Sequence, residues 1–269
     1  MTLSRFAAAS WLATAATMWL AAFSPAQVIG INFNGSGAGG PGTRPGPYDL
    51  VPSEVAGALP QANWNNAPST NGTTSNLVLS TGAATTASVT ASGSNNPWSL
   101  PDPVPFTTDG TLMRGYLDSS STSTTTVNVS GLPAAFANSR YNVWVYFDGD
   151  NGGDNRVSSF TIGGTTLFGR DAANTNFSGT FVQVPSSSNT NQQANTPAGN
   201  YIVFFGVTGP SFTITTTPQF STSATLRAPL NALQIELAPV PEPGSLTLLG
   251  AAAASLWWVR RRSRRMVCA

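Results

Sequence analysis

The chain has 269 residues, of which 41% are hydrophobic, and this is enough for one sizeable domain with a buried core. Charged residues make up only 9% of the chain, all twelve basic residues are arginine, and histidine is absent. This composition excludes a Ser-His-Asp triad, an imidazole zinc site, a lysine Schiff base and a Walker A loop. Because the one cysteine is Cys268, a disulfide within the chain is excluded as well.

Residues 1–26 have the three parts of a secretory signal peptide. Arg5 supplies a positive charge, the stretch 6–23 is apolar, and the tripeptide 24–26 has small residues at its first and third positions, as a cleavage site requires. The sequence therefore predicts an N-terminal signal helix, and an anchor helix that is never cleaved is the alternative. In both cases we expect the general secretion machinery to export the chain that follows.

The body of the chain, residues 27–238, shows the pattern of strands joined by turns. Ser, Thr, Asn and Gly are abundant, and no stretch has apolar residues at 3.6-residue spacing over three turns. The clearest predicted strands are 28–33, 125–129, 141–147, 156–162, 165–168, 180–184, 201–207, 212–216 and 230–237. Roughly nine to eleven short strands predict an extracellular, all-β domain, an antiparallel β-sandwich that is jelly-roll-like. In outline it resembles galactose-binding-like and carbohydrate-binding jelly rolls, whose first and last strands pair.

Two of these strand predictions are stronger than the rest. The stretch 141–147 is rich in β-branched and aromatic residues, which predicts a buried central strand. The pair Gly163-Gly164 separates the predicted strands 156–162 and 165–168, and this spacing is the signal of a tight β-hairpin.

The loop directly after the predicted central strand has the residue types of a calcium site. Asp148, Asp150 and Asp154 alternate with Asn and Gly, and such a loop can bring several oxygen ligands onto one cation. It departs from an EF-hand loop, because Gly152 stands at the fifth position and Ser159 at the twelfth. The alternative is a solvated hairpin turn, which favours the same residue types.

Two tryptophans, Trp64 and Trp98, are candidates for sugar binding because both lie among asparagines in polar sequence. An exposed ring there could stack on a sugar while neighbouring amides bind its hydroxyls. The alternative is that both rings cover the ends of the sandwich core. Three polar segments are predicted to be long loops, where binding residues tend to lie: 63–74, 92–109 and 186–197.

The acidic residues of the body do not single out a catalytic pair. Ten of them are spread over the domain, and only Glu54 and Glu236 are glutamates, so no pair at glycosidase spacing can be named. We expect no catalytic residues and no enzymatic activity, with a glycoside hydrolase as a distant third possibility. Arg114 and Asp171 are expected in ion pairs near a sheet edge, with ligand contacts as the alternative.

The C-terminus has three parts in a fixed order. A proline-rich motif comes first, an apolar run at about 244–259 follows and predicts a transmembrane helix, and an arginine cluster at 260–265 places that end in the cytoplasm. The motif consists of Val240, Pro241, Glu242 and Pro243. The cluster contains Arg260, Arg261, Arg262, Arg264 and Arg265.

The segment 239–269 resembles the PEP-CTERM sorting signal of Gram-negative bacteria. The resemblance implies recognition by an exosortase, with cleavage near the motif and release or transfer of the domain to the cell surface. Before processing, the C-terminal helix would hold the chain in the inner membrane. Proteins with this signal are commonly tied to exopolysaccharide and biofilm matrix, so the resemblance also implies a polysaccharide partner.

Charge and export together favour one functional hypothesis. The body carries six arginines against ten acidic residues, about −4 in all, and has no basic run, which disfavours nucleic-acid binding. The sequence therefore indicates a non-enzymatic protein of the cell surface or extracellular matrix. The alternative is a calcium-assisted carbohydrate-binding module that uses Asp148, Asp150 and Asp154 with Trp64 or Trp98.

Overall fold

The computed structural model describes residues 27–35, 48–94, 97–100, 105–121, 123–185 and 195–238. The chain divides into two compact units, Met1–Leu237 and Ala238–Ala269. The predicted signal peptide, the proline-rich motif, the predicted transmembrane helix and the arginine cluster all lie outside the described residues. Within the described ranges, no helix is long and apolar enough to cross a membrane.

The described part of the first unit is made mostly of strands. One sheet contains β1 (Val28–Phe33), β2 (Asn65–Ala67), β8 (Arg140–Tyr146), β11 (Tyr201–Thr208) and β13 (Ala232–Leu237). A second contains β3 (Gly72–Ser75), β4 (Ser88–Ser92), β7 (Thr125–Ser130), β9 (Arg156–Ile162), β10 (Thr165–Asp171) and β12 (Phe212–Ser221). The remaining elements are the strand pair β5 (Pro97–Ser99) and β6 (Gly115–Leu117), and the helices α2 (Thr108–Arg114) and α3 (Ala134–Ala137).

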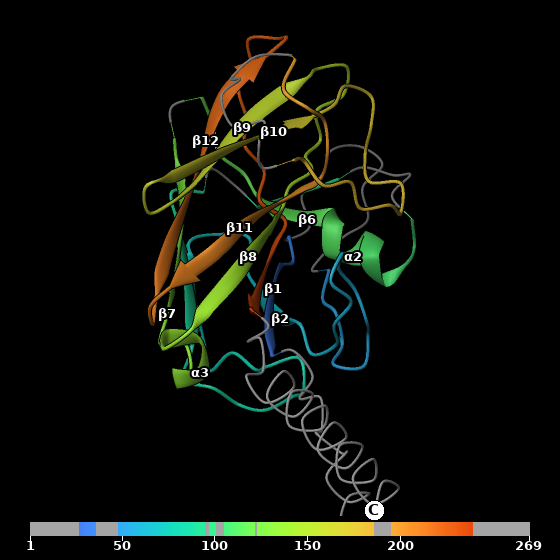
Figure 1. Cartoon of the computed structure of the whole chain (residues 1–269). Coiled ribbons are helices and arrows are strands. Elements are labelled where there is room, and N and C mark those ends of the chain that lie inside the picture. The colour runs from blue at the N-terminus through green and yellow to red at the C-terminus, as the bar shows by residue number, and fades with distance from the viewer. Residues whose placement is uncertain are drawn as a thin grey trace, which may run out of the picture. The chain divides into compact units, whose positions relative to one another are not determined.

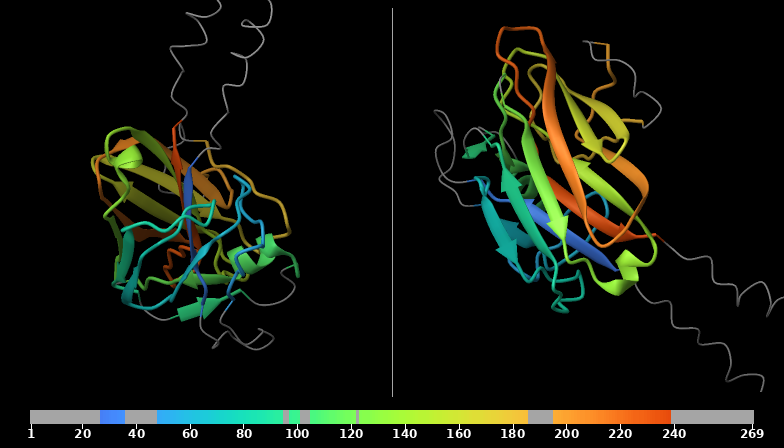
Figure 2. Two further views of the ribbon diagram at one scale, coloured as in Figure 1. Left: turned by 90° about the horizontal axis from the view of Figure 1, so that it is seen from below. Right: turned by 90° about the vertical axis from the view of Figure 1, so that its left-hand side faces the viewer.

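The two large sheets pack face to face in a sandwich-like arrangement (Figures 1 and 2). Strand order is β11-β8-β13-β1-β2 in the first sheet and β10-β9-β12-β7-β4-β3 in the second. The predicted fold class, a β-rich domain of two packed sheets, is confirmed at this level. The expected pairing of the first and last strands is present, since Ile29 of β1 lies opposite Ile235 of β13 in an antiparallel register. The sheets are not purely antiparallel, because β1 and β2 run parallel.

The main core lies between the two sheets. Ile31, Val143 and Ile235 of the first sheet pack in one cluster with Val127 and Phe160 of the second. Strand β7 alternates buried and less buried residues, as expected where one face of a sheet packs on the core and the other faces solvent. The alternation that strands of a sandwich require is thus present in the second sheet.

The first sheet is covered on its other face as well, and this explains why its strands are apolar on both sides. All six residues of β1 are buried. A second apolar cluster joins Tyr146 of β8 to Trp64, to Leu112 and Met113 of α2, and to Phe177. The prediction of a buried central strand at 141–147 is confirmed, because β8 lies between β11 and β13 and is packed from both faces.

Three local expectations are corrected by the structure. The segment 180–184 is not a strand, since its only ladder contact is an isolated parallel bridge between Gln183 and Tyr201. The predicted loops 63–74 and 92–109 include short strands and the start of α2. Helix α2 has seven residues, too few to show apolar periodicity over three turns, and its start depends on a cap: Thr107 Oγ1 accepts a hydrogen bond of 3.1 Å from Gly110 N.

The acidic loop after β8 is not a hairpin turn. The next strand, β9, belongs to the other sheet, so the segment 148–155 crosses from one layer of the sandwich to the other. The predicted hairpin lies further along, where Ile162 of β9 is opposite Thr165 of β10, and Gly163 takes a φ of 58° that favours glycine. The crossing segment is therefore the feature that places polar residues at the end of the sandwich.

Candidate functional site

A polar pocket of about 140 Å³ opens beside the crossing segment 148–155. Segments far apart in the sequence form its wall: the strand pair β5 and β6, the start of β9, and the stretch that leads to β13. Its lining residues are Trp98, Tyr116, Asp118, Asp150, Arg156, Thr225 and Arg227. Two aromatic rings, two carboxylates and two guanidinium groups thus share one small cavity.

An ion pair forms one side of this pocket. Arg227 Nη1 lies 2.9 Å from Asp118 Oδ2, and the side chain of Asp118 is only 8% exposed. Burial raises the pKa of Asp118 to about 6, although the charges of Arg227 and Arg156 act in the opposite direction. The other oxygen, Oδ1, is buried and has no hydrogen-bond partner among the described residues. Asp118 therefore has a carboxylate oxygen free to accept a hydrogen bond.

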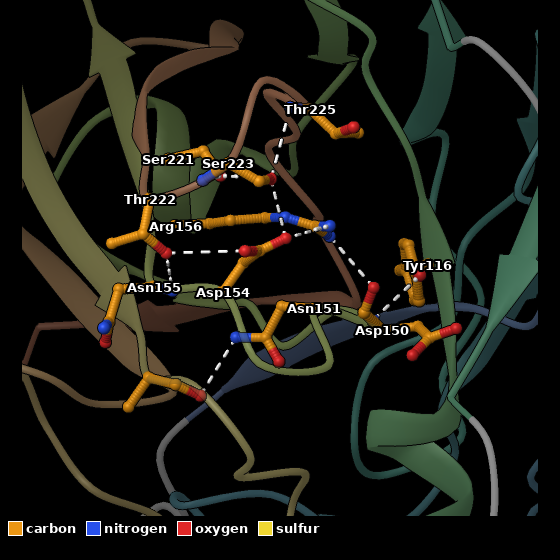
Figure 3. A network of polar contacts seen from close by, with 11 residues as sticks. Tyr116, Asp150, Asn151, Asp154, Asn155, Arg156, Ser221, Thr222, Ser223 and Thr225 are labelled. Atoms are coloured by element: carbon orange, nitrogen blue, oxygen red, sulfur yellow. Dashed lines mark hydrogen bonds and ion pairs between the residues drawn. The ribbon is translucent and has the colours of Figure 1, made fainter.

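The opposite side is held by Tyr116 and the backbone of Asp150. The Tyr116 hydroxyl accepts a hydrogen bond of 3.1 Å from Asp150 N, and the Asp150 carbonyl accepts one of 2.9 Å from Arg156 Nη1 (Figure 3). Burial, and then the charge of Asp118, raise the pKa of Tyr116 well above its ordinary value. The hydroxyl therefore stays protonated and serves as a hydrogen-bonding group.

Asp154 fastens the crossing segment to the loop after β12. Its Oδ2 accepts a hydrogen bond of 2.7 Å from Ser223 Oγ and lies 3.6 Å from Arg156 Nη2 (Figure 3). Asn155 N donates to Thr222 Oγ1 at 3.0 Å. Arg156 is thus held by Asp154 and by the Asp150 carbonyl, and these contacts fix its guanidinium group in the wall of the pocket.

The sequence-predicted residues fall into different places. Trp98 and Asp150, named for different reasons, line the same pocket, and Trp98 is half-buried there. Trp64 is 4% exposed, and its Nε1 donates to Gln61 O at 3.1 Å inside the second apolar cluster, as the core interpretation of this ring requires. Asp148 lines a second pocket, and Asp154 makes the contacts described above.

The three aspartates of the predicted calcium loop do not converge on one point. In the described part of the chain, no three residues of the types His, Cys, Asp or Glu are grouped so as to hold a metal ion. Instead, Asp148 lines one pocket together with Asp171, the last residue of the edge strand β10. Burial, followed by the charge of Asp171, raises the pKa of Asp148 well above its ordinary value, and burial raises the pKa of Asp171 to about 8.

Sequence reasoning missed most of the pocket. Asp118 and Arg227 stand 109 residues apart, and no local pattern connects them. Tyr116 lies in a short apolar strand that looks like ordinary core sequence. Arg114, the other residue expected in an ion pair, lies buried at the end of α2 with its guanidinium 5.5 Å from the centre of the Tyr48 ring.

Comparison with known proteins identifies the C-terminal segment. Residues 239–265 match the PEP-CTERM protein-sorting motif, so the resemblance of this segment is confirmed. The matched residues include the whole proline-rich motif and the five arginines of the cluster. No curated protein matches the chain. Proteins with this motif are exported and sorted to the cell surface, and the motif implies that an exosortase processes this chain.

Proposed function

We propose that this chain is a non-enzymatic protein of the cell surface or extracellular matrix that associates with exopolysaccharide. The single observation that carries the proposal is that the sorting motif at 239–265 follows a β-sandwich-like domain in the same chain. The composition supports it, because a body without histidine, lysine or cysteine has no imidazole, amine or thiol side chain to act as a catalytic base or nucleophile. In this proposal, the domain has a structural role at the cell surface and catalyses no reaction.

The sorting part of the proposal is tested by following the mass and location of the chain. The wild-type chain is expected in the surface or medium fraction at less than its full-length mass. A variant in which Pro241, Glu242 and Pro243 are replaced by alanine is expected to stay in the membrane at full length. The same retention is expected for the wild-type chain in a host without its exosortase. Recovery of full-length protein from the cytoplasm alone would contradict the proposal.

The matrix part is tested separately. Exopolysaccharide from the producing bacterium is sedimented with and without the chain, and the strain that lacks the chain is compared with its parent for the amount and cohesion of its matrix. Co-sedimentation with the polymer and a weaker matrix in the deletion strain are expected. A chain that is processed correctly but leaves both measurements unchanged would retain the sorting assignment and remove the polysaccharide role.

A carbohydrate-binding module is the second candidate, and the pocket at Trp98 is the observation that favours it. A half-buried aromatic ring beside neutral and charged hydrogen-bonding groups is the combination that binds a sugar: the ring stacks on its apolar face, and Asp150 and Thr225 can reach its hydroxyls. The jelly-roll comparison supports the same candidate, since the first and last strands pair here as in carbohydrate-binding jelly rolls. The calcium-assisted form of this candidate stays a prediction.

Binding to an array of bacterial and plant polysaccharides tests this candidate. Trp98→Ala is expected to abolish binding while the circular dichroism spectrum is unchanged. Phe205→Ala is the matched control, because this ring is 64% exposed and lines a different pocket. Binding that survives Trp98→Ala, or is lost equally in Phe205→Ala, would remove the pocket from the mechanism.

A further inference from the structure

Two buried carboxylates face the same cavity at the junction of the two sheets. Asp148 follows β8 of the first sheet, and Asp171 is the last residue of β10 in the second. They are 4% and 5% exposed, and both line a pocket of about 230 Å³. Gly149 N donates a hydrogen bond of 2.9 Å to Asp171 Oδ2, which brings the chain next to Asp148 against the second carboxylate.

Within the described residues, neither Asp148 nor Asp171 forms an ion pair with an arginine, although the charges of Arg156 and Arg170 act on Asp171 without direct contact. Arg156, the first residue of β9, donates to the Asp150 carbonyl and lies beside Asp154. Arg170, the neighbour of Asp171 in sequence, donates instead to Asn155 Oδ1 at 2.6 Å and to Thr196 O at 2.7 Å. Two carboxylates that are buried together without a contacting counter-ion cost free energy that the fold must recover elsewhere.

One carboxylate oxygen of these two residues, Oδ1 of Asp148, lacks a hydrogen-bond partner among the described residues. Asp148 Oδ1 is buried and makes no hydrogen bond within the described residues, although the backbone of Asp148 is held firmly by Asn231, whose Oδ1 accepts from Asp148 N at 2.6 Å. The amide oxygen of Asn151, three residues on, is buried without a partner as well. A firmly held segment with unsatisfied buried oxygens is the arrangement that a cation would complete.

The remaining walls of the pocket offer oxygen atoms as metal ligands, and their described residues include no histidine or cysteine of the kind that zinc prefers. Hydroxyl, amide and carbonyl oxygens are available on the segment after β10 and on the turn before β11. The polar residues that line these walls are Thr175, Asn176, Ser178, Thr180 and Asn200. Calcium accepts six to eight oxygen ligands in flexible geometry, whereas magnesium requires a near-ideal octahedron and keeps several of its waters.

We propose that Asp148 and Asp171 together bind one calcium ion, which links the end of β8 in the first sheet to the end of β10 in the second. The site differs from the one that the alternating aspartates of 148–155 suggest, because Asp150 and Asp154 face other neighbours. The ion acts as a clamp between the layers: its two carboxylate ligands come from different sheets, so removing it loosens the sandwich at this end. The proposal does not depend on glycan binding.

The experiment measures calcium binding and thermal unfolding of the full chain, purified in a mild detergent. Isothermal titration with CaCl2 is expected to show one site, and calcium at about 100 times the dissociation constant is expected to raise Tm by about 5 to 10 °C over the chelated sample. Asp148→Asn and Asp171→Asn keep the shape of each side chain and remove one charge. Each is expected to weaken calcium binding at least tenfold.

The Asn variants also give a readout that a merely structural role would not produce. Without calcium each variant removes one of two buried carboxyl groups that repel each other when ionised, so its Tm is expected above that of the wild type in chelator, and with calcium it is expected below. Asp154→Asn is the matched control and should bind calcium as the wild type does, because Asp154 accepts a hydrogen bond from Ser223 and does not line this pocket.

Three outcomes would overturn the proposal. One is a wild-type chain that shows neither binding heat nor a Tm shift at 10 mM CaCl2, a test concentration about tenfold above the weakest extracellular calcium sites. Another is calcium binding that survives both Asn variants. The third is binding that is lost equally in Asp154→Asn, which would return the site to the loop 148–155. MgCl2 at the same concentration serves as the ionic-strength control and is expected to leave Tm unchanged.

Discussion

Arg227 donates a hydrogen bond of 2.9 Å from Nη1 to Oδ2 of Asp118, a residue that precedes it by 109 positions. The pair lies where the loop before β13 passes the end of β6, next to the pocket that contains Trp98. It connects two segments that share no strand ladder beyond the single bridge between Leu117 and Leu230. The ion pair therefore belongs to the packing of the domain as much as to the pocket.

The raised pKa of Asp118 predicts a pH dependence of stability. Burial lifts this pKa from 3.8 to about 6 in the folded chain. The folded state thus binds the proton more tightly than the unfolded state, so the contribution is fully present below about pH 4 and is lost as the pH rises through about 6. In Asp118→Asn this loss, about 3 kcal/mol at most, is expected to disappear.

Urea unfolding between pH 4 and 7, followed by tryptophan fluorescence, measures this difference. The free energy of unfolding of the wild type should fall relative to that of Asp118→Asn across this window. Asp49→Asn, a change at an exposed carboxylate, serves as the control and should keep the wild-type profile. Parallel profiles for the wild type and Asp118→Asn would show that Asp118 titrates normally.

The two tryptophans are predicted to differ in their effect on stability. Trp64 is buried in the second apolar cluster and donates to Gln61 O, so Trp64→Ala should destabilise the domain by about 3 to 5 kcal/mol. Trp98 is half-buried at the rim of the pocket, and Trp98→Ala should cost about 1 to 2 kcal/mol. The midpoints of urea unfolding give both values, and equal losses would contradict the assignment of Trp64 to the core.

Two glycines, one in β10 and one in the turn before it, give a matched pair of backbone tests. A Cβ at Gly169 would lie 2.3 Å from Cζ of the Phe147 ring, which is itself fixed in the core, so Gly169→Ala should destabilise by about 1 to 3 kcal/mol. A Cβ at Gly164, in the hairpin turn, meets no atom within 4 Å. Gly164→Ala is therefore expected to be neutral or to stabilise by up to about 1 kcal/mol. Thermal unfolding of both variants decides the point.

The hydroxyl of Tyr146 is predicted to contribute to the packing of the outer face of the first sheet. It donates to Gln234 Oε1 and accepts a hydrogen bond of 2.9 Å from Ala58 N, and both partners are left unsatisfied in Tyr146→Phe. The loss should be about 1 to 3 kcal/mol. Tyr201→Phe is the control, since within the described residues its hydroxyl makes a single long, exposed contact of 3.5 Å, and this change should cost under about 0.5 kcal/mol. Chemical unfolding measures both.

The sequence by itself determined that the protein is exported and sorted, and it determined the class of its fold. The sorting motif is a linear signal contained in residues 239–265, so it can be recognised from the sequence without knowledge of the fold. Strand patterning is also local: the alternation in β7, the Gly163-Gly164 turn and the apolar run of β8 each depend on residues within a few positions. This is why the β-sandwich class was predictable.

Only the tertiary structure decided which side chains meet. Asp150 and Trp98 reach one pocket because the crossing segment and the strand pair β5–β6 lie at the same end of the sandwich. Asp171 joins Asp148 because the segment after β8 contacts the end of β10, although the two strands belong to different sheets. The pattern of aspartates in 148–155 predicted a shared ligand, but Asp148 is buried, whereas Asp154 accepts a hydrogen bond from Ser223. The partners of a charged group are selected by packing between segments far apart in the chain, and the spacing of residues within one segment does not reveal this packing.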